Sequence, residues 1–126
     1  MNAYRVILWA TAILVGLCEA TPKEAAAGGT CILRPRPYQL RTDTVRWNFR
    51  LKPGAECVQG LRWSTIMLDE LSVIKAPKYG HLEFHGPSFR YVSGANLEKD
   101  SFAIKIRGTA LRLAGTSIIE VEVNPE

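Results

Sequence analysis

The chain has 126 residues and a formal net charge of +4. This length is enough for one domain, and we expect no more than one. The charge is uneven, with seven basic and two acidic residues from Cys31 to Arg62 but four basic and five acidic residues from Ser93 to Glu126. The basic half is either an ordinary solvated surface or a face directed at an anionic envelope polymer, a lipid head group or an acidic partner.

The N-terminal stretch has the pattern of an export signal. Arg5 precedes an apolar run of 13 residues, 6–18, which is shorter than the roughly 20 residues that a membrane span needs and suits a signal peptide. We therefore predict a signal peptide over residues 1–20, with cleavage after Ala20 or, as the alternative, after Ala27. Lipidation at Cys18 is disfavoured because Leu17 stands where the processing enzyme requires a small residue. The expected location is periplasmic or extracellular.

Two cysteines, Cys31 and Cys57, follow the predicted signal peptide. An even number of cysteines in an exported chain predicts one disulfide between them. Closing a loop of about 27 residues would stabilise the fold by roughly 3 kcal/mol. A reactive or metal-bound pair is the alternative, but this spacing supplies no further ligands.

The next segment is expected to lead into the domain. Residues 21–29 are small and polar, and the sequence Arg-Pro-Arg-Pro at 34–37 favours an extended backbone. We assign residues 21–37 to a flexible or extended leader and residues 38–126 to the domain.

Beyond the leader, apolar residues recur with a period of two, which is typical of half-buried strands. About seven short strands separated by turn residues are predicted, at 45–51, 61–65, 71–76, 81–85, 89–91, 102–107 and 119–123. Residues 66–72 are ambiguous between a helical turn and a crossover. The pattern predicts an all-β, antiparallel sandwich or barrel. Trp47, Trp63 and Phe102 are candidate core aromatics.

The second half of the chain carries a set of spaced motifs, which are Pro-Lys-Tyr-Gly-His-Leu at 77–82, Phe-Arg-Tyr at 89–91, Asp-Ser-Phe at 100–102 and an alternating strand at 119–123. This order resembles the immunoglobulin-like, cadherin-like repeats of bacterial surface proteins, in single copy, over about residues 73–123. The resemblance implies an immunoglobulin-like β-sandwich. It concerns turns and core positions, so it implies a fold and not an activity.

Two groups of residues are candidates for a functional site. Arg46 and Arg50, together with Arg62, form the candidate binding surface for an anionic polymer. His81, Glu83 and His85 alternate on one strand face, so adjacent members lie about 6.6 Å apart and a histidine-glutamate pair could share a metal. The sequence nominates no third ligand, and we expect a solvated polar face instead.

These observations predict a non-catalytic binding or structural module at the cell envelope, without a cofactor. Its partner would be an envelope protein or an anionic envelope polymer, and nucleic acid is disfavoured because no aromatic residues are interleaved with the basic ones. The alternative is a small metal-binding or accessory enzyme that uses the His81, Glu83 and His85 face.

Overall fold

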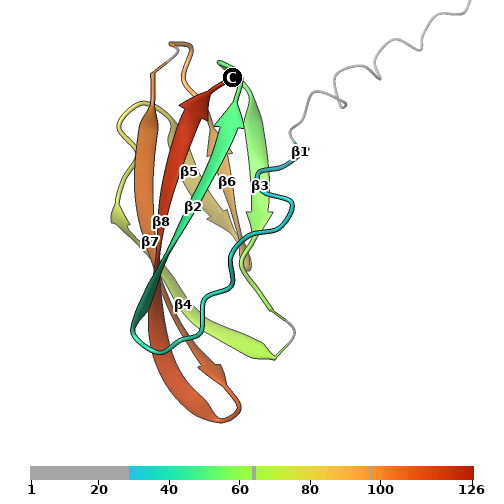
Figure 1. Ribbon diagram of the computed structural model, residues 1–126, viewed down its shortest axis with the longest axis vertical. Helices are drawn as coiled ribbons and strands as arrows, with labels where there is room; N and C mark the ends of the chain where they lie inside the picture. Colours follow the sequence, from blue (N-terminus) through green and yellow to red (C-terminus); the bar gives the residue numbers. More distant parts are fainter. Residues whose placement is uncertain (1–28, 64, 97) are drawn as a thin grey trace, which may run out of the picture.

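The computed structural model describes residues 29–63, 65–96 and 98–126, and the predicted signal peptide with Cys18 and both cleavage sites lies outside them. The described residues form eight strands in two sheets of four (Figure 1). The strands are β1 (Gly29–Thr30), β2 (Asp43–Leu51), β3 (Glu56–Gly60), β4 (Ile66–Lys75), β5 (His81–His85), β6 (Ser88–Val92), β7 (Asp100–Ala110) and β8 (Leu113–Pro125). The first sheet has the order β1-β3-β6-β5 and the second the order β2-β8-β7-β4.

The prediction of an all-β fold is confirmed, but the prediction of purely antiparallel pairing is wrong. β2 runs parallel to β8 along its whole length, from Asp43 opposite Ser117 to Leu51 opposite Pro125. β1 also pairs with β3 in parallel. Alternation of apolar residues predicts a strand and its buried face, yet it carries no information about the direction of the neighbouring strand.

The strands with strict alternation are confirmed in β2, β7 and β8, whose inward side chains are buried. The strand predicted at 61–65 is wrong, because Leu61 lies in a connection where its N–H donates to the carbonyl of Pro87. β3 was not predicted, since one of its two buried side chains is the polar Gln59. The ambiguous residues 66–72 belong to β4, where two register shifts break the period of two.

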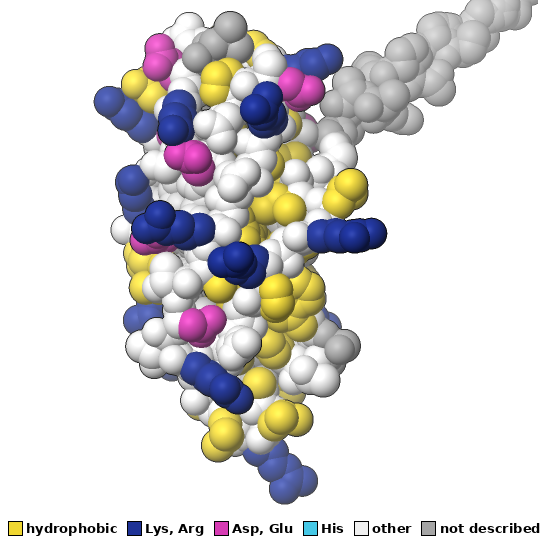
Figure 2. Space-filling model, in the orientation of Figure 1, with side chains coloured by type: hydrophobic (Ala, Val, Ile, Leu, Met, Phe, Trp, Pro, Cys, Tyr) yellow, Lys and Arg dark blue, Asp and Glu magenta, His cyan; other side chains and the backbone are white. Residues whose placement is uncertain are grey.

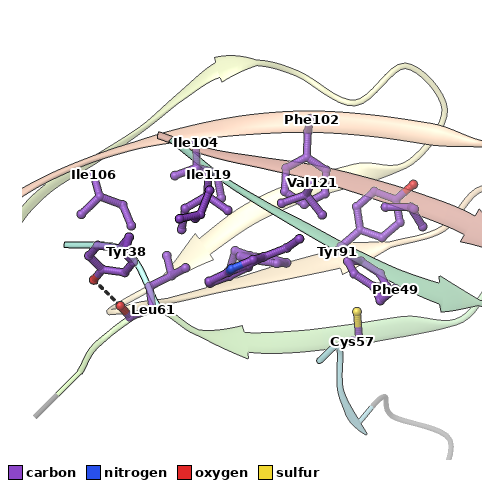
Figure 3. Close-up of a cluster of buried hydrophobic side chains, with 14 of the residues drawn as sticks. Tyr38, Phe49, Cys57, Leu61, Tyr91, Phe102, Ile104, Ile106, Ile119 and Val121 are labelled. Carbon is purple, nitrogen blue, oxygen red and sulfur yellow. Dashed lines mark hydrogen bonds between the residues drawn. The ribbon is translucent and has the colours of Figure 1, made fainter. Parts of the chain in front are cut away.

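The core lies between the two sheets (Figure 3). Phe102 of β7 faces the other sheet, where its ring packs against Phe89 and Tyr91 at centroid distances of 5.3 and 5.6 Å. The predicted core positions of Trp47 and Phe102 are confirmed, and both side chains are almost fully buried. Trp63 is half-buried and packs on the edge of the core beside Tyr38.

The segment before residue 38 is joined to the sandwich. Cys31 and Cys57 form the predicted disulfide, with an S–S distance of 2.10 Å. The side chain of Gln59 accepts a hydrogen bond from the Ile32 N–H at 2.7 Å. The Trp47 ring N–H donates to the carbonyl of Arg36 at 2.8 Å. Residues 29–37 of the predicted leader therefore contribute a short strand and covalent and polar contacts to the domain.

Candidate functional site

The outer face of the β2-β8-β7-β4 sheet carries most of the exposed cations of the strands, and we call it the basic face. Alternation along β2 places Arg46 and Arg50 on this face because Val45, Trp47 and Phe49 are buried. Six basic and four acidic side chains lie on the basic face or at its edge, and they are Arg46, Arg50, Lys75, Lys99, Lys105 and Arg107 with Asp69, Glu70, Glu120 and Glu122. Figure 2 shows dark-blue side chains distributed over this face, with fewer magenta ones between them.

Three ion pairs lie on the basic face or at its edge. They are Arg46–Glu120 at 3.2 Å, Lys99–Glu122 at 2.9 Å and Arg107–Glu70 at 2.9 Å. The Lys99 ammonium lowers the pKa of the Glu122 carboxyl. All three pairs are solvent-exposed, and such pairs contribute little to stability, so their cations are available to a ligand. Within the described residues, Arg50 and Lys105 belong to no ion pair.

A shallow groove of about 530 Å³ crosses the basic face. Arg46 of β2 lies opposite Glu120 of β8, Glu120 lies opposite Ala103 of β7, and Ala103 lies opposite Lys75 of β4. The small side chain of Ala103 leaves a hollow in the middle of this row, with a cation at each end. Lys75 also donates a hydrogen bond to the hydroxyl of Ser101 at 2.9 Å.

Arg62 lies apart from the other two arginines of the predicted surface. It follows β3 in the opposite sheet and lines a second groove of about 550 Å³, together with Leu71 of β4 and Phe84 of β5. Arg46 lines the groove of the basic face and not this one. The structure therefore brings Arg46 and Arg50 together on one face and places Arg62 at the open edge between the two sheets.

His81, Glu83 and His85 share the outer face of β5, as the alternation predicts. The His85 Nε2 lies 3.2 Å from a Glu83 carboxylate oxygen, and the His81 Nε2 lies 3.9 Å from the other. Arg90 of β6 binds both Glu83 and Glu56 of β3, at 2.6 Å each. The hydrogen bonds from His85 and Arg90 lower the pKa of the Glu83 carboxyl.

Arg90 is the residue of this cluster that the sequence did not reveal. It lies opposite Glu83 on one side and Val58 on the other, and such cross-strand neighbours become visible only when the pairing is known. Its guanidinium occupies the position between two carboxylates where a cation would bind. Among the described residues, no three or more histidine, cysteine, aspartate or glutamate side chains are arranged to hold a metal ion.

A buried carboxylate joins the motifs of the second half, and we call its contacts the Asp100 network. Asp100 is 4% exposed and accepts hydrogen bonds from the N–H groups of Lys78, Tyr79 and Gly80, from its neighbour Ser101 and from the Tyr91 hydroxyl. A Cβ at Gly80 would overlap the Tyr91 side chain, so this position requires glycine.

The charge state of Asp100 follows from these contacts. Burial alone raises the pKa of the carboxyl, but the hydrogen bonds from Tyr91, Gly80 and Lys78 outweigh that effect and lower the pKa below 3.8. Burial and the adjacent carboxylate in turn raise the pKa of the Tyr91 hydroxyl. The carboxylate is buried and accepts hydrogen bonds from three segments of the chain, which indicates a structural role.

A second carboxylate organises the entry to β2, and we call its contacts the Asp43 network. Asp43 accepts hydrogen bonds from the N–H groups of Gln39 and Arg41 and from the Ser117 hydroxyl, which itself accepts from the Leu40 N–H. Burial by itself raises the pKa of the Asp43 carboxyl. The hydrogen bonds from Ser117 and the backbone outweigh this effect, so the pKa is lowered overall.

Neither comparison with protein-family models nor comparison with curated proteins gave a match. In the part of the chain that the structure describes, no helix has the length and apolar character needed to cross a membrane.

Proposed function

We propose that this protein is an exported, immunoglobulin-like binding module of the cell envelope that performs no catalysis. The two four-stranded sheets and the Cys31–Cys57 disulfide support this interpretation. Further support comes from the Asp100 network, in which three motifs of the proposed family likeness meet at one carboxylate. These motifs act on folding, and this is why they recur without a shared activity.

The ligand that the surface favours is an anionic polymer bound along the basic face. The observation that carries this proposal is the contrast between the two outer faces. The basic face has six basic and four acidic side chains, whereas the opposite face has Arg90 held between Glu56 and Glu83. An extended polyanion could follow the groove across the strands and contact Arg46 and Lys75 at its ends.

The alternative of a metal-binding or accessory enzyme has less support. It requires the carboxylate of Glu83, which Arg90 and His85 already contact. A metal bound at the Oε2 atom of Glu83 would have to displace the Arg90 guanidinium, which also binds Glu56.

Binding to dextran sulfate tests the proposal, with neutral dextran as the reference. The triple variant Arg46→Gln, Arg50→Gln and Lys105→Gln removes three cations from the basic face. We expect its affinity for dextran sulfate to fall roughly tenfold or more, and binding of the unmodified protein to weaken as salt rises. The matched control is Arg34→Gln, Arg36→Gln and Lys78→Gln, which removes the same charge from exposed positions outside this sheet.

Equal losses in the two triple variants would show that net charge and not the basic face determines binding. Absence of binding to dextran sulfate by the unmodified protein at low salt would contradict the polyanion proposal outright. In both cases circular dichroism and urea unfolding of the variants establish that the fold is retained.

A further inference from the structure

The turn between β7 and β8 exposes large apolar side chains. Leu111 and Leu113 are 83% and 74% exposed, and Met67, on the neighbouring strand β4, is 64% exposed. Met67 pairs with Thr109 and Ile66 pairs with Ala110, so β4 brings Met67 close to this turn. We call Met67 and residues 110–113 the hairpin tip.

The turn has positive φ angles at two residues that are not glycine. Leu111 and Arg112 have φ angles of 51° and 68°, a left-handed region that disfavours side chains with a Cβ. Two-residue turns of this kind favour Asn-Gly, because asparagine and glycine adopt positive φ most readily. Here a leucine and an arginine occupy these positions.

The hairpin tip projects from the end of the sandwich. Leu40 packs against Gly108 and Gly115, which face each other across the hairpin. The turn lies three residues further along, roughly 10 Å beyond this row. Figure 1 shows the β7–β8 hairpin at the lower end of the molecule, and Figure 2 shows apolar and basic side chains together there.

The sequence on either side of the turn is basic. Between Asp100 and Glu120 the chain has no acidic residue, and it has Lys105, Arg107 and Arg112. Two carboxylates of β4 lie near the turn, where Asp69 accepts a hydrogen bond from Thr109 and Glu70 pairs with Arg107. Among the described residues Arg112, at the turn itself, belongs to no ion pair.

We propose that the hairpin tip inserts into the surface of an anionic phospholipid bilayer. Leu111, Leu113 and Met67 would enter the boundary between head groups and acyl chains, while Arg112 contacts lipid phosphates. Amphipathic segments at membrane surfaces bury their apolar side to a depth of roughly 5–10 Å, which matches the projection of the tip. A convex apolar tip suits a fluid surface, whereas a protein partner would have to supply a matching concave socket.

Sedimentation with lipid vesicles tests this inference. The unmodified protein should bind vesicles made from an equimolar mixture of phosphatidylglycerol and phosphatidylcholine more tightly than vesicles of phosphatidylcholine alone. The variant Leu111→Ser/Leu113→Ser should bind the anionic vesicles about 100-fold less tightly. Arg112→Gln should reduce that binding about fivefold. The matched control is Leu33→Ser, because Leu33 is 90% exposed but lies next to the disulfide.

A position-specific measurement makes the result independent of how the rest of the chain attaches to lipid. In the variant Leu111→Trp, lipids brominated on their acyl chains should quench the added tryptophan fluorescence on binding. In Leu33→Trp they should leave it unchanged. Absence of quenching at position 111 would overturn the proposal, as would equal vesicle binding by the double serine variant and Leu33→Ser.

The proposal is also separate from polyanion binding by the basic face. Removing the leucines should leave dextran sulfate binding unchanged. If the leucines instead cause concentration-dependent oligomers in the absence of lipid, and vesicle binding does not depend on them, the hairpin tip is a self-association surface and the membrane proposal is wrong.

Discussion

Asp100 and Asp43 each fix an irregular segment of the backbone by hydrogen bonds, at two places in the sandwich. Each carboxylate accepts backbone N–H groups from an irregular segment and one hydroxyl from another strand, Tyr91 for Asp100 and Ser117 for Asp43. They differ in burial, because Asp100 is 4% exposed whereas Asp43 is half-buried. If the Asp43 side chain is removed, water can accept the hydrogen bonds of its former donors, but water has little access to the former donors of Asp100.

The two networks also hold different kinds of backbone. Asp43 stabilises a segment in which Leu40 and Thr42 have φ angles of 57° and 60°. A Cβ at Gly115 would overlap the Leu40 carbonyl, so the strained segment lies directly against β8. The loop that Asp100 holds, residues 76–80, has no positive φ angle. A fully buried carboxylate and a half-buried one can therefore have similar lists of partners, and we expect them to differ in their contribution to stability.

The largest effect should come from deleting the two carboxylates. Asp100→Ala leaves buried donors without partners, and we expect it to lower the free energy of unfolding by about 4 kcal/mol. Asp43→Ala should lower it by about 1–2 kcal/mol, because water replaces the lost acceptor. Urea unfolding followed by tryptophan fluorescence measures both. Equal losses would mean that burial does not separate the two networks.

Acid should weaken the fold through the same groups. The folded-state pKa of both aspartates lies below the ordinary value of 3.8, so their stabilisation is complete above that value and is lost as the pH falls through the folded pKa. Stability measured by urea unfolding should be nearly constant from about pH 7 to about pH 5 and fall steeply below about pH 4.

The variant Asp100→Asn isolates the contribution of that residue. It should be less stable at neutral pH and should show a shallower decline in acid. Glu83 and Glu122 also have lowered pKa values, but they are unchanged between the two proteins and cancel in the comparison. An identical acid profile for Asp100→Asn would exclude Asp100 as a source of the pH dependence.

The smallest effect should come from removing the hydroxyls that complete the networks. Tyr91→Phe removes one donor from Asp100 and keeps the ring stacked on Phe102, so we expect a loss of about 1–2 kcal/mol. Ser117→Ala removes the link between Asp43 and the Leu40 N–H and should lower stability by about 1 kcal/mol. Thermal unfolding of each single variant gives the order. A greater loss for Ser117→Ala would reverse the ranking of the two networks.

The parts of the fold that could be predicted are those in which one strand face is strictly apolar. β2, β7 and β8 have this pattern, since positions such as Trp47, Ile104 and Val121 alternate with exposed charges. β3 could not be found in this way because it buries Gln59 for a hydrogen bond to Ile32. The pairing of β2 with β8 depends on contacts between distant residues, which local alternation does not encode.

The same limit applies to the candidate site. The shared face of Arg46 and Arg50 follows from their spacing along one strand. The neighbours Lys75 and Lys105 come from other strands, and the position of Arg62 depends on the connection that follows β3. The contact of Arg90 with Glu83 and Glu56 likewise depends on the register of three strands.

The parallel alignment of β2 with β8 has a consequence for how the chain folds. Asp43 and Ser117 are 74 residues apart in sequence, so β2 has no partner in its own sheet until β8 has been synthesised. Contacts of such wide separation slow folding, because the intervening loop must be closed before they form. The 26-residue spacing of Cys31 and Cys57 permits a much earlier closure. We therefore expect the Cys31–Cys57 disulfide to form while β2 still lacks its partner strand β8. At that stage the apolar side chains of β2 are uncovered, and the chain is most exposed to aggregation.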